Sequence, residues 1–93
     1  MPKITLVDQE INNTHIIETV SIDDNGDLLL EGHDMGEAPK EFWGKSSYEH
    51  TATVKAKDKD WLLVKLLAAK FKSKLEITTY LKENNIPYKV FSW

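Results

Sequence analysis

Histidines and acids are the residues of this chain whose chemistry could support metal binding or proton transfer. His33 is followed directly by Asp34, and His50 stands in a second segment that we expect to form a neighbouring strand. Imidazole nitrogens and carboxylate oxygens bind metal ions, and a histidine beside a carboxylate can act as an acid–base pair. However, the chain has no His-x-His or His-Glu-x-x-His spacing that would fix two ligands on one element. A metal- or ligand-binding protein that uses His33, Asp34 and His50 is therefore our alternative hypothesis.

Gly44, Lys45 and Ser46 resemble the end of a phosphate-binding loop. Such a loop needs a glycine five positions before its Gly-Lys pair, and it connects a strand to a helix. Pro39, which has no backbone N–H, occupies that position, and the residues after Ser46 alternate as a strand does. We therefore interpret Gly44 as the end of a short helix followed by a turn.

The stretch "DDNGD" (residues 23–27) resembles the start of a calcium-binding loop. That loop requires glycine at its sixth position and glutamate at its twelfth, where this chain has Leu28 and Asp34. Asn25-Gly26 between two apolar runs is instead typical of a tight hairpin turn. We expect no cofactor and no metal at this place.

Composition excludes several classes of protein. The chain has 93 residues, which predicts one domain over residues 1–93. It contains no cysteine, which excludes disulfides, thiolate metal sites and a cysteine nucleophile. No apolar run is long enough for a membrane span, and the first residues do not resemble a secretion signal. We therefore expect a cytoplasmic protein that does not bind membranes.

The charges favour a protein partner over nucleic acid. Twelve basic residues, all of them lysine, face fifteen acidic residues, for a net charge of -3. Nucleic-acid binding usually relies on net positive charge and on arginine, so we do not expect it. Acids dominate from Asp8 to Glu49 and lysines from Lys55 to Lys89, and an acidic half of this kind can complement a basic protein surface.

Periodicity and turn signals predict the elements. We expect strands at residues 3–7, 14–23, 28–33, 48–55 and 88–93, with a turn or irregular link at 8–13. We also expect a short helix at 37–43 and two longer helices at 59–71 and 74–84. The order β-β-β-(short α)-β-α-α-β indicates an α+β fold. It would contain an antiparallel sheet of about four to five strands with two helices packed on one face.

Helix ends carry recognisable signals. Asp58 can cap the first long helix, and Ser73 with Glu76 three residues later fits a capping box at the start of the second. Asn84-Asn85 can end the second helix in a left-handed conformation, with Ile86 as the apolar residue after the cap.

Aromatic residues are numerous for so short a chain, and they suggest a contact surface. Tryptophan and tyrosine anchor protein interfaces at low entropic cost. Both faces of the expected last strand are apolar, so a second copy of the chain is one candidate partner. The partner-binding residues that we predict from the acids and aromatics together are Asp34, Glu37, Glu41, Trp43 and Tyr48.

Three segments, "LLLEGHDMG", "EFWGKSSYEH" and "IPYKVFSW", are similar to motifs of a family of small uncharacterised bacterial proteins. The resemblance covers most of the chain from Gly26 onward, and it implies a bacterial cytoplasmic origin. It assigns no functional residue. Our leading hypothesis is thus a non-enzymatic protein-interaction domain, such as an inhibitor, an immunity-type protein or an adaptor.

Overall fold

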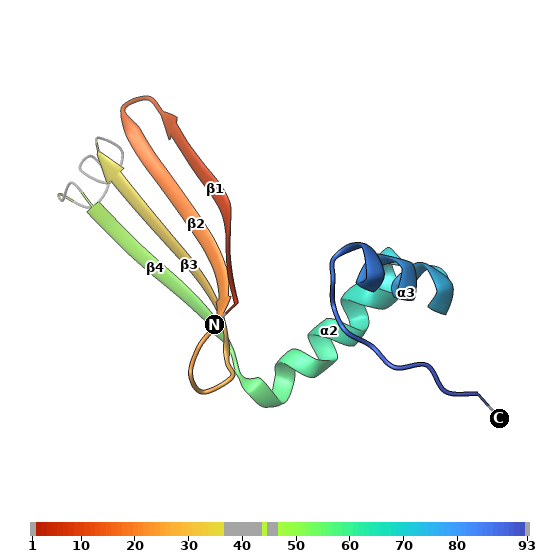
Figure 1. Cartoon of the computed structure of the whole chain (residues 1–93). Helices are drawn as coiled ribbons and strands as arrows, with labels where there is room; N and C mark the ends of the chain where they lie inside the picture. The colour runs from red at the N-terminus through yellow and green to blue at the C-terminus, as the bar shows by residue number, and fades with distance from the viewer. Residues whose placement is uncertain (1, 37–43, 45–46, 93) are drawn as a thin grey trace. The chain divides into compact units, whose positions relative to one another are not determined.

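A computed structural model describes residues 2–36, 44 and 47–92 (Figure 1). This part of the chain forms a four-stranded antiparallel sheet and two helices, which confirms the α+β class. The chain divides into two compact units, Met1–Lys59 and Asp60–Trp93. The packing of the helices on one face of the sheet therefore stays a prediction, as does a single domain. Neither described helix is long and apolar enough to cross a membrane.

The sheet is a meander in which each strand pairs antiparallel with the next one along the chain. Its strands are β1 (Lys3–Ile11), β2 (Thr14–Ile22), β3 (Leu28–Gly36) and β4 (Ser47–Val54), in the spatial order β1-β2-β3-β4. Figure 1 shows them from red to green, with β1 and β4 at the two edges. The predicted short helix at residues 37–43 lies outside the described residues.

β1 is longer than the sequence predicts: of the expected turn or irregular link at residues 8–13, the turn is present, but residues 8–11 belong to the strand. Only Asn12 and Asn13 form the turn, and their φ angles of 49° and 64° fit the two central positions of a type I′ hairpin turn. The strand continues through Ile11. Its polar residues obscured it, because an edge strand exposed to solvent tolerates charges that a central strand would not.

The hairpin predicted at Asn25-Gly26 is confirmed. Ile22 pairs with Leu28, so the loop spans residues 23–27. Gly26 has a φ of 78°, in the left-handed region that glycine adopts without strain. The Asp23 carboxylate accepts hydrogen bonds from the backbone N–H groups of Asn25 and Asp27, both at 2.9 Å. The Asp23 side chain therefore satisfies two backbone N–H groups of the turn.

The two faces of the sheet differ in polarity, because successive side chains of a strand point to opposite faces. The register places these apolar residues on one face, called the apolar face: Ile4, Leu6, Val20, Leu28, Leu30, Ala52 and Val54. Towards the other end of the strands the same face also carries Glu18, Asp34, Tyr48 and His50. The other face, called the polar face, carries mostly polar residues: Lys3, Thr5, Asp8, Glu10, Thr19, Glu31, Glu49, Thr51 and Thr53. Ile17, Leu29 and Met35 are on this face as well.

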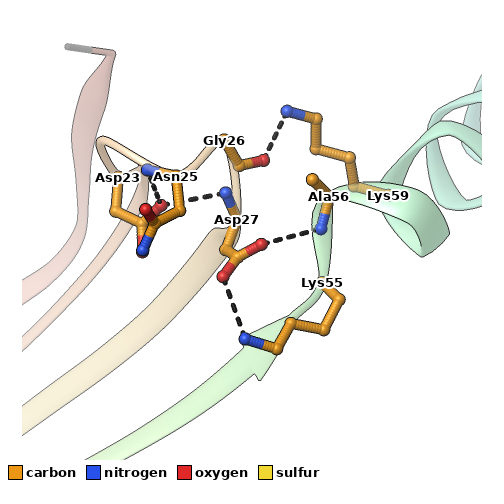
Figure 2. Close-up of polar contacts among 7 residues, drawn as sticks. All are labelled: Asp23, Asn25, Gly26, Asp27, Lys55, Ala56 and Lys59. Carbon is orange, nitrogen blue, oxygen red and sulfur yellow. Dashed lines mark hydrogen bonds and ion pairs between the residues drawn. The ribbon is translucent and has the colours of Figure 1, made fainter.

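The junction between β4 and helix α2 (Ala56–Lys70) is held by Asp27 from the hairpin loop (Figure 2). Asp27 is buried, with 7% of its surface exposed. Its Oδ1 accepts a hydrogen bond from Ala56 N at 2.8 Å, and its Oδ2 lies 3.2 Å from Lys55 Nζ. Lys59 Nζ donates to the carbonyl oxygen of Gly26. The bond from Ala56 N–H, together with Lys55, holds the pKa of Asp27 below its ordinary value of 3.8, against the opposing effect of burial.

The prediction that Asp58 caps this helix was wrong. α2 begins at Ala56, so Asp58 lies inside its first turn. A lysine precedes the helix and has no side-chain oxygen to accept from the first free N–H groups. Asp27, which is distant in sequence, supplies that acceptor instead.

The ends of helix α3 (Lys74–Glu83) confirm the predicted signals. Ser73 Oγ accepts from Glu76 N at 3.2 Å, and Glu76 Oε1 accepts from Lys72 N at 3.3 Å. At the other end Asn85 has a φ of 57°, and Ile86 N donates to Leu81 O at 2.9 Å. This bond joins residues five apart and is the 6→1 hydrogen bond that defines a Schellman motif.

The last predicted strand, residues 88–93, was wrong for the residues that the structure describes. Residues 86–92 have no strand structure. Tyr88 and Val90 instead line a shallow depression together with Leu75 and Thr78 of α3. Tyr88 and Val90, which alternate along an extended segment, therefore face helix α3 on one side of that segment. Residues 86–92 have no strand pairing.

Candidate interaction site

Asp34 and Tyr48 are the two predicted partner-binding residues that the structure describes, and they lie together. They are directly opposite partners in the β3–β4 register, so their side chains leave the same face of the sheet. Both are half-buried. Glu37, Glu41 and Trp43 lie outside the described residues.

His50 joins this pair through ring stacking. Its ring centroid lies 5.4 Å from that of Tyr48, with 27° between the ring planes. The two side chains share a face because they are two residues apart on β4. We call Asp34, Tyr48 and His50 the Tyr48 patch.

Gly32 leaves room for the His50 ring of the patch. It is the direct partner of His50, and a Cβ added at Gly32 would lie only 2.1 Å from His50 Cε1. The imidazole therefore occupies the space that a side chain at Gly32 would need. An aromatic ring over a strand glycine in this way covers backbone that would otherwise be open.

His33 lies on the opposite face from the other residues of the alternative hypothesis. It is opposite Glu49, with 3.7 Å between Nε2 and Oε1, whereas Asp34 and His50 point to the other side of the sheet. The structure does not bring His33, Asp34 and His50 together. Among the described residues no group of three or more histidines and acids is placed to hold a metal ion.

The polar face carries two histidine–carboxylate contacts. His15 Nε2 hydrogen-bonds Asp8 Oδ1, and His33 is beside Glu49, whose side chain is 77% exposed. Exposed pairs of this kind contribute little to stability. Glu31 lines the same shallow depression as His33 and Glu49.

The β3–β4 ribbon has a one-sided charge. Its two strands contain Glu31, Asp34 and Glu49 and no lysine or arginine. The acids lie on both faces of the ribbon, so a positively charged partner would be attracted to it from either side.

The pairing of Gly32 with His50 was missed from the sequence. Ten residues separate β3 from β4, and a connection of that length leaves the register open, unlike a two-residue turn. A strand glycine within an apolar and acidic segment was the one available signal.

Comparison with known proteins identifies no relative: no family model, no curated protein and no solved structure matches this chain.

Proposed function

We propose that this chain is a non-enzymatic protein-interaction domain that binds a basic protein surface through the Tyr48 patch. Glu37, Glu41 and Trp43 would add contacts from the segment that joins β3 to β4. The observation that carries the proposal is the placement of Asp34 opposite Tyr48, with His50 stacked on the tyrosine ring. An inhibitor, an immunity-type protein or an adaptor would each use such a surface.

Preorganisation favours binding at this place. An aromatic side chain that is already stacked loses little freedom when a partner covers it, whereas a mobile side chain costs about 0.5–1.5 kcal/mol to immobilise. Tyr48 is held by His50 before any partner arrives. Its ring and hydroxyl can then serve as an interface anchor that has an apolar body and a polar tip.

Charge favours a cationic partner. Asp34 belongs to the patch itself, whereas Glu31 and Glu49 are on the same two strands but point to the opposite face. Acids without intervening lysines attract a basic surface and speed its encounter. Binding should therefore weaken as salt is raised, because exposed charges are screened within about 8 Å at physiological ionic strength.

The proposal is tested by affinity capture from the source cell with wild type and three variants. Asp34→Lys and Tyr48→Ala change the patch. Asp24→Lys is the matched control, because it makes the same change of charge in the exposed loop at the far end of β3. Asp24 lies in the loop before Leu28, the first residue of β3, and Asp34 is six residues beyond Leu28. The control is therefore about 20 Å from the patch along the strand.

We expect a basic protein that is recovered with wild type and with Asp24→Lys and is lost with both patch variants. A Trp43→Ala, Glu41→Lys double variant should lose it as well. Equal recovery of every protein by wild type and the patch variants would contradict the proposal.

A further inference from the structure

The outer edge of β1 offers a second interaction surface, distinct from the Tyr48 patch. β1 ends the order of strands in the described sheet, and all of its residues except Val7 are exposed. An edge strand presents a row of backbone N–H and C=O groups that can pair with another strand. Which groups face outward follows from the phase of the pairing with β2.

A hydrogen bond at one end of the β1–β2 hairpin and the two-residue turn at the other end fix this phase. Ile22 N donates to Pro2 O at 3.1 Å, so the next pair along, that of Lys3, is not hydrogen-bonded. The backbone groups of Lys3, and those of Thr5 two residues later, therefore point away from β2. At the other end a two-residue turn makes Ile11 and Thr14 a hydrogen-bonded pair.

Hydrogen-bonded and non-hydrogen-bonded pairs alternate from that turn, so the backbone groups of Glu10 and Asp8 point away from β2. The outward groups thus belong to Lys3, Thr5, Asp8 and Glu10. The step from Thr5 to Asp8 covers three residues rather than two, because the register shifts by a β-bulge between Thr5 and Val7.

A second copy of the chain matches this irregular edge. When two β1 strands run antiparallel with Lys3 opposite Glu10, Thr5 is opposite Asp8. The irregular interval from Thr5 to Asp8 in one strand is then opposite the same interval in the other strand. Outward-facing backbone groups therefore meet at every pair, from Lys3 to Glu10, and no further bulge is needed.

Side chains agree with the same register. Lys3 and Glu10 both belong to the polar face, where they would meet as opposite charges at each end of the seam. Leu6 would lie opposite Val7 of the second copy at the centre. Leu6 is 62% exposed, so it has surface available to cover. Charges on an edge strand usually discourage pairing with unrelated strands. In antiparallel self-pairing, however, Lys3 of each copy would be opposite Glu10 of the other, and the two charges attract each other.

We propose that the β1 edge is a homodimer interface, in which two four-stranded sheets join into one continuous sheet through antiparallel pairing of β1 with β1. The proposal does not rest on the proposed function, since it uses a different strand. Either can fail without the other.

Charge reversal tests the pairing in the full chain by sedimentation equilibrium. Wild type should reach about 21 kDa, twice the monomer mass of 10.7 kDa. Lys3→Glu and Glu10→Lys should each raise the dimer dissociation constant about ten- to hundred-fold, because each creates two like-charged cross-strand pairs. The double variant should restore wild-type association. Asp24→Lys and Lys72→Glu, which reverse exposed charges elsewhere, should have no effect.

Cysteine cross-linking tests the register. Because the chain has no cysteine, an Ile4→Cys, Gln9→Cys variant contains only the two introduced thiols. Within one chain they lie about 17 Å apart along β1, too far for a disulfide, whereas in the proposed dimer they form non-hydrogen-bonded pairs about 4.5 Å apart between Cα atoms. We expect a covalent dimer on oxidation, and none from Ile4→Cys alone.

A monomer at all concentrations, or a double charge variant that stays as weak as the single ones, would overturn the proposal. A 21 kDa species that does not cross-link, or that cross-links equally with Ile4→Cys alone, would place the interface elsewhere and overturn it as well.

Discussion

Replacement of Gly32 by alanine is expected to be less favourable for stability when the His50 ring is present than when it is absent. In the wild type a Cβ at Gly32 would come within 2.1 Å of His50 Cε1, whereas ordinary contacts begin at 3.4 Å. The ring must therefore move by at least 1.3 Å, the difference between these distances. In the His50→Ala background that space is empty, and the new methyl group meets no ring.

The magnitudes follow from two opposing effects. Alanine in place of glycine stabilises a strand by roughly 0.5–1 kcal/mol. Displacing the ring forfeits its stack on Tyr48, worth about 0.5–1.5 kcal/mol for an aromatic pair. We therefore expect Gly32→Ala to lie between about 0.5 kcal/mol stabilising and about 1 kcal/mol destabilising in the wild type. With His50→Ala it should stabilise by about 0.5–1 kcal/mol.

Urea denaturation of the four proteins of this double-mutant cycle measures the coupling, with circular dichroism as the signal. A coupling of about 1 kcal/mol would appear in thermal denaturation as roughly 4–8 °C. The same effect of Gly32→Ala in both backgrounds would refute the reasoning, since it would mean that the ring does not occupy the space above the glycine. The cycle also bears on the Tyr48 patch, because a displaced His50 no longer holds Tyr48.

Three further predictions concern the junction, the first turn and the helical unit. Asp27→Asn should lower the urea midpoint at pH 7, and the difference from wild type should vanish on acidification. Because the pKa of Asp27 is depressed below 3.8, its contribution is present above that value and is lost as pH falls through the folded pKa, which urea titrations between pH 7 and pH 2.5 would show. Asn13→Val should cost about 1–2 kcal/mol, since Asn13 has a φ of 64° and a branched residue is strained there, whereas Asn13→Gly should be tolerated; thermal denaturation of the pair distinguishes them. Ser73→Ala should cost about 1 kcal/mol through loss of the bond to Glu76 N, and Ser73→Asp, which keeps an acceptor, should retain most of it in helix-detected urea unfolding.

Features set by neighbouring residues were predictable from the sequence. The hairpin at Asn25-Gly26, the capping box at Ser73 and the left-handed Asn85 each depend on a few consecutive side chains and backbone angles. The end of α2 that begins at Ala56 was not predictable in the same way. Its acceptor, Asp27, lies 29 residues away and reaches it only through the fold.

Strand alternation could place residues on faces but could not pair them. We expected the strands of His33 and His50 to be neighbours, and they are, but the register of their pairing places the two histidines on opposite faces. A shift of one residue would have put His33 on the same face as His50, which is why the metal hypothesis was open before the fold was known. The same register brought Asp34 and Tyr48 together. Sequence periodicity therefore identified candidate residues of the patch, and only the pairing of β3 with β4 selected among them.

The two proposed surfaces would act together if both exist. Self-pairing uses β1, and partner binding uses β3 and β4, so neither blocks the other. In the dimer the two β4 strands would lie seven strand spacings apart, or about 34 Å. Such a dimer presents two Tyr48 patches, and a partner with two basic sites at that spacing would bind more tightly than either patch alone would allow. Lys3→Glu should then weaken capture of a multivalent partner while the affinity for a single immobilised site stays unchanged, which surface binding at low and high partner density would separate.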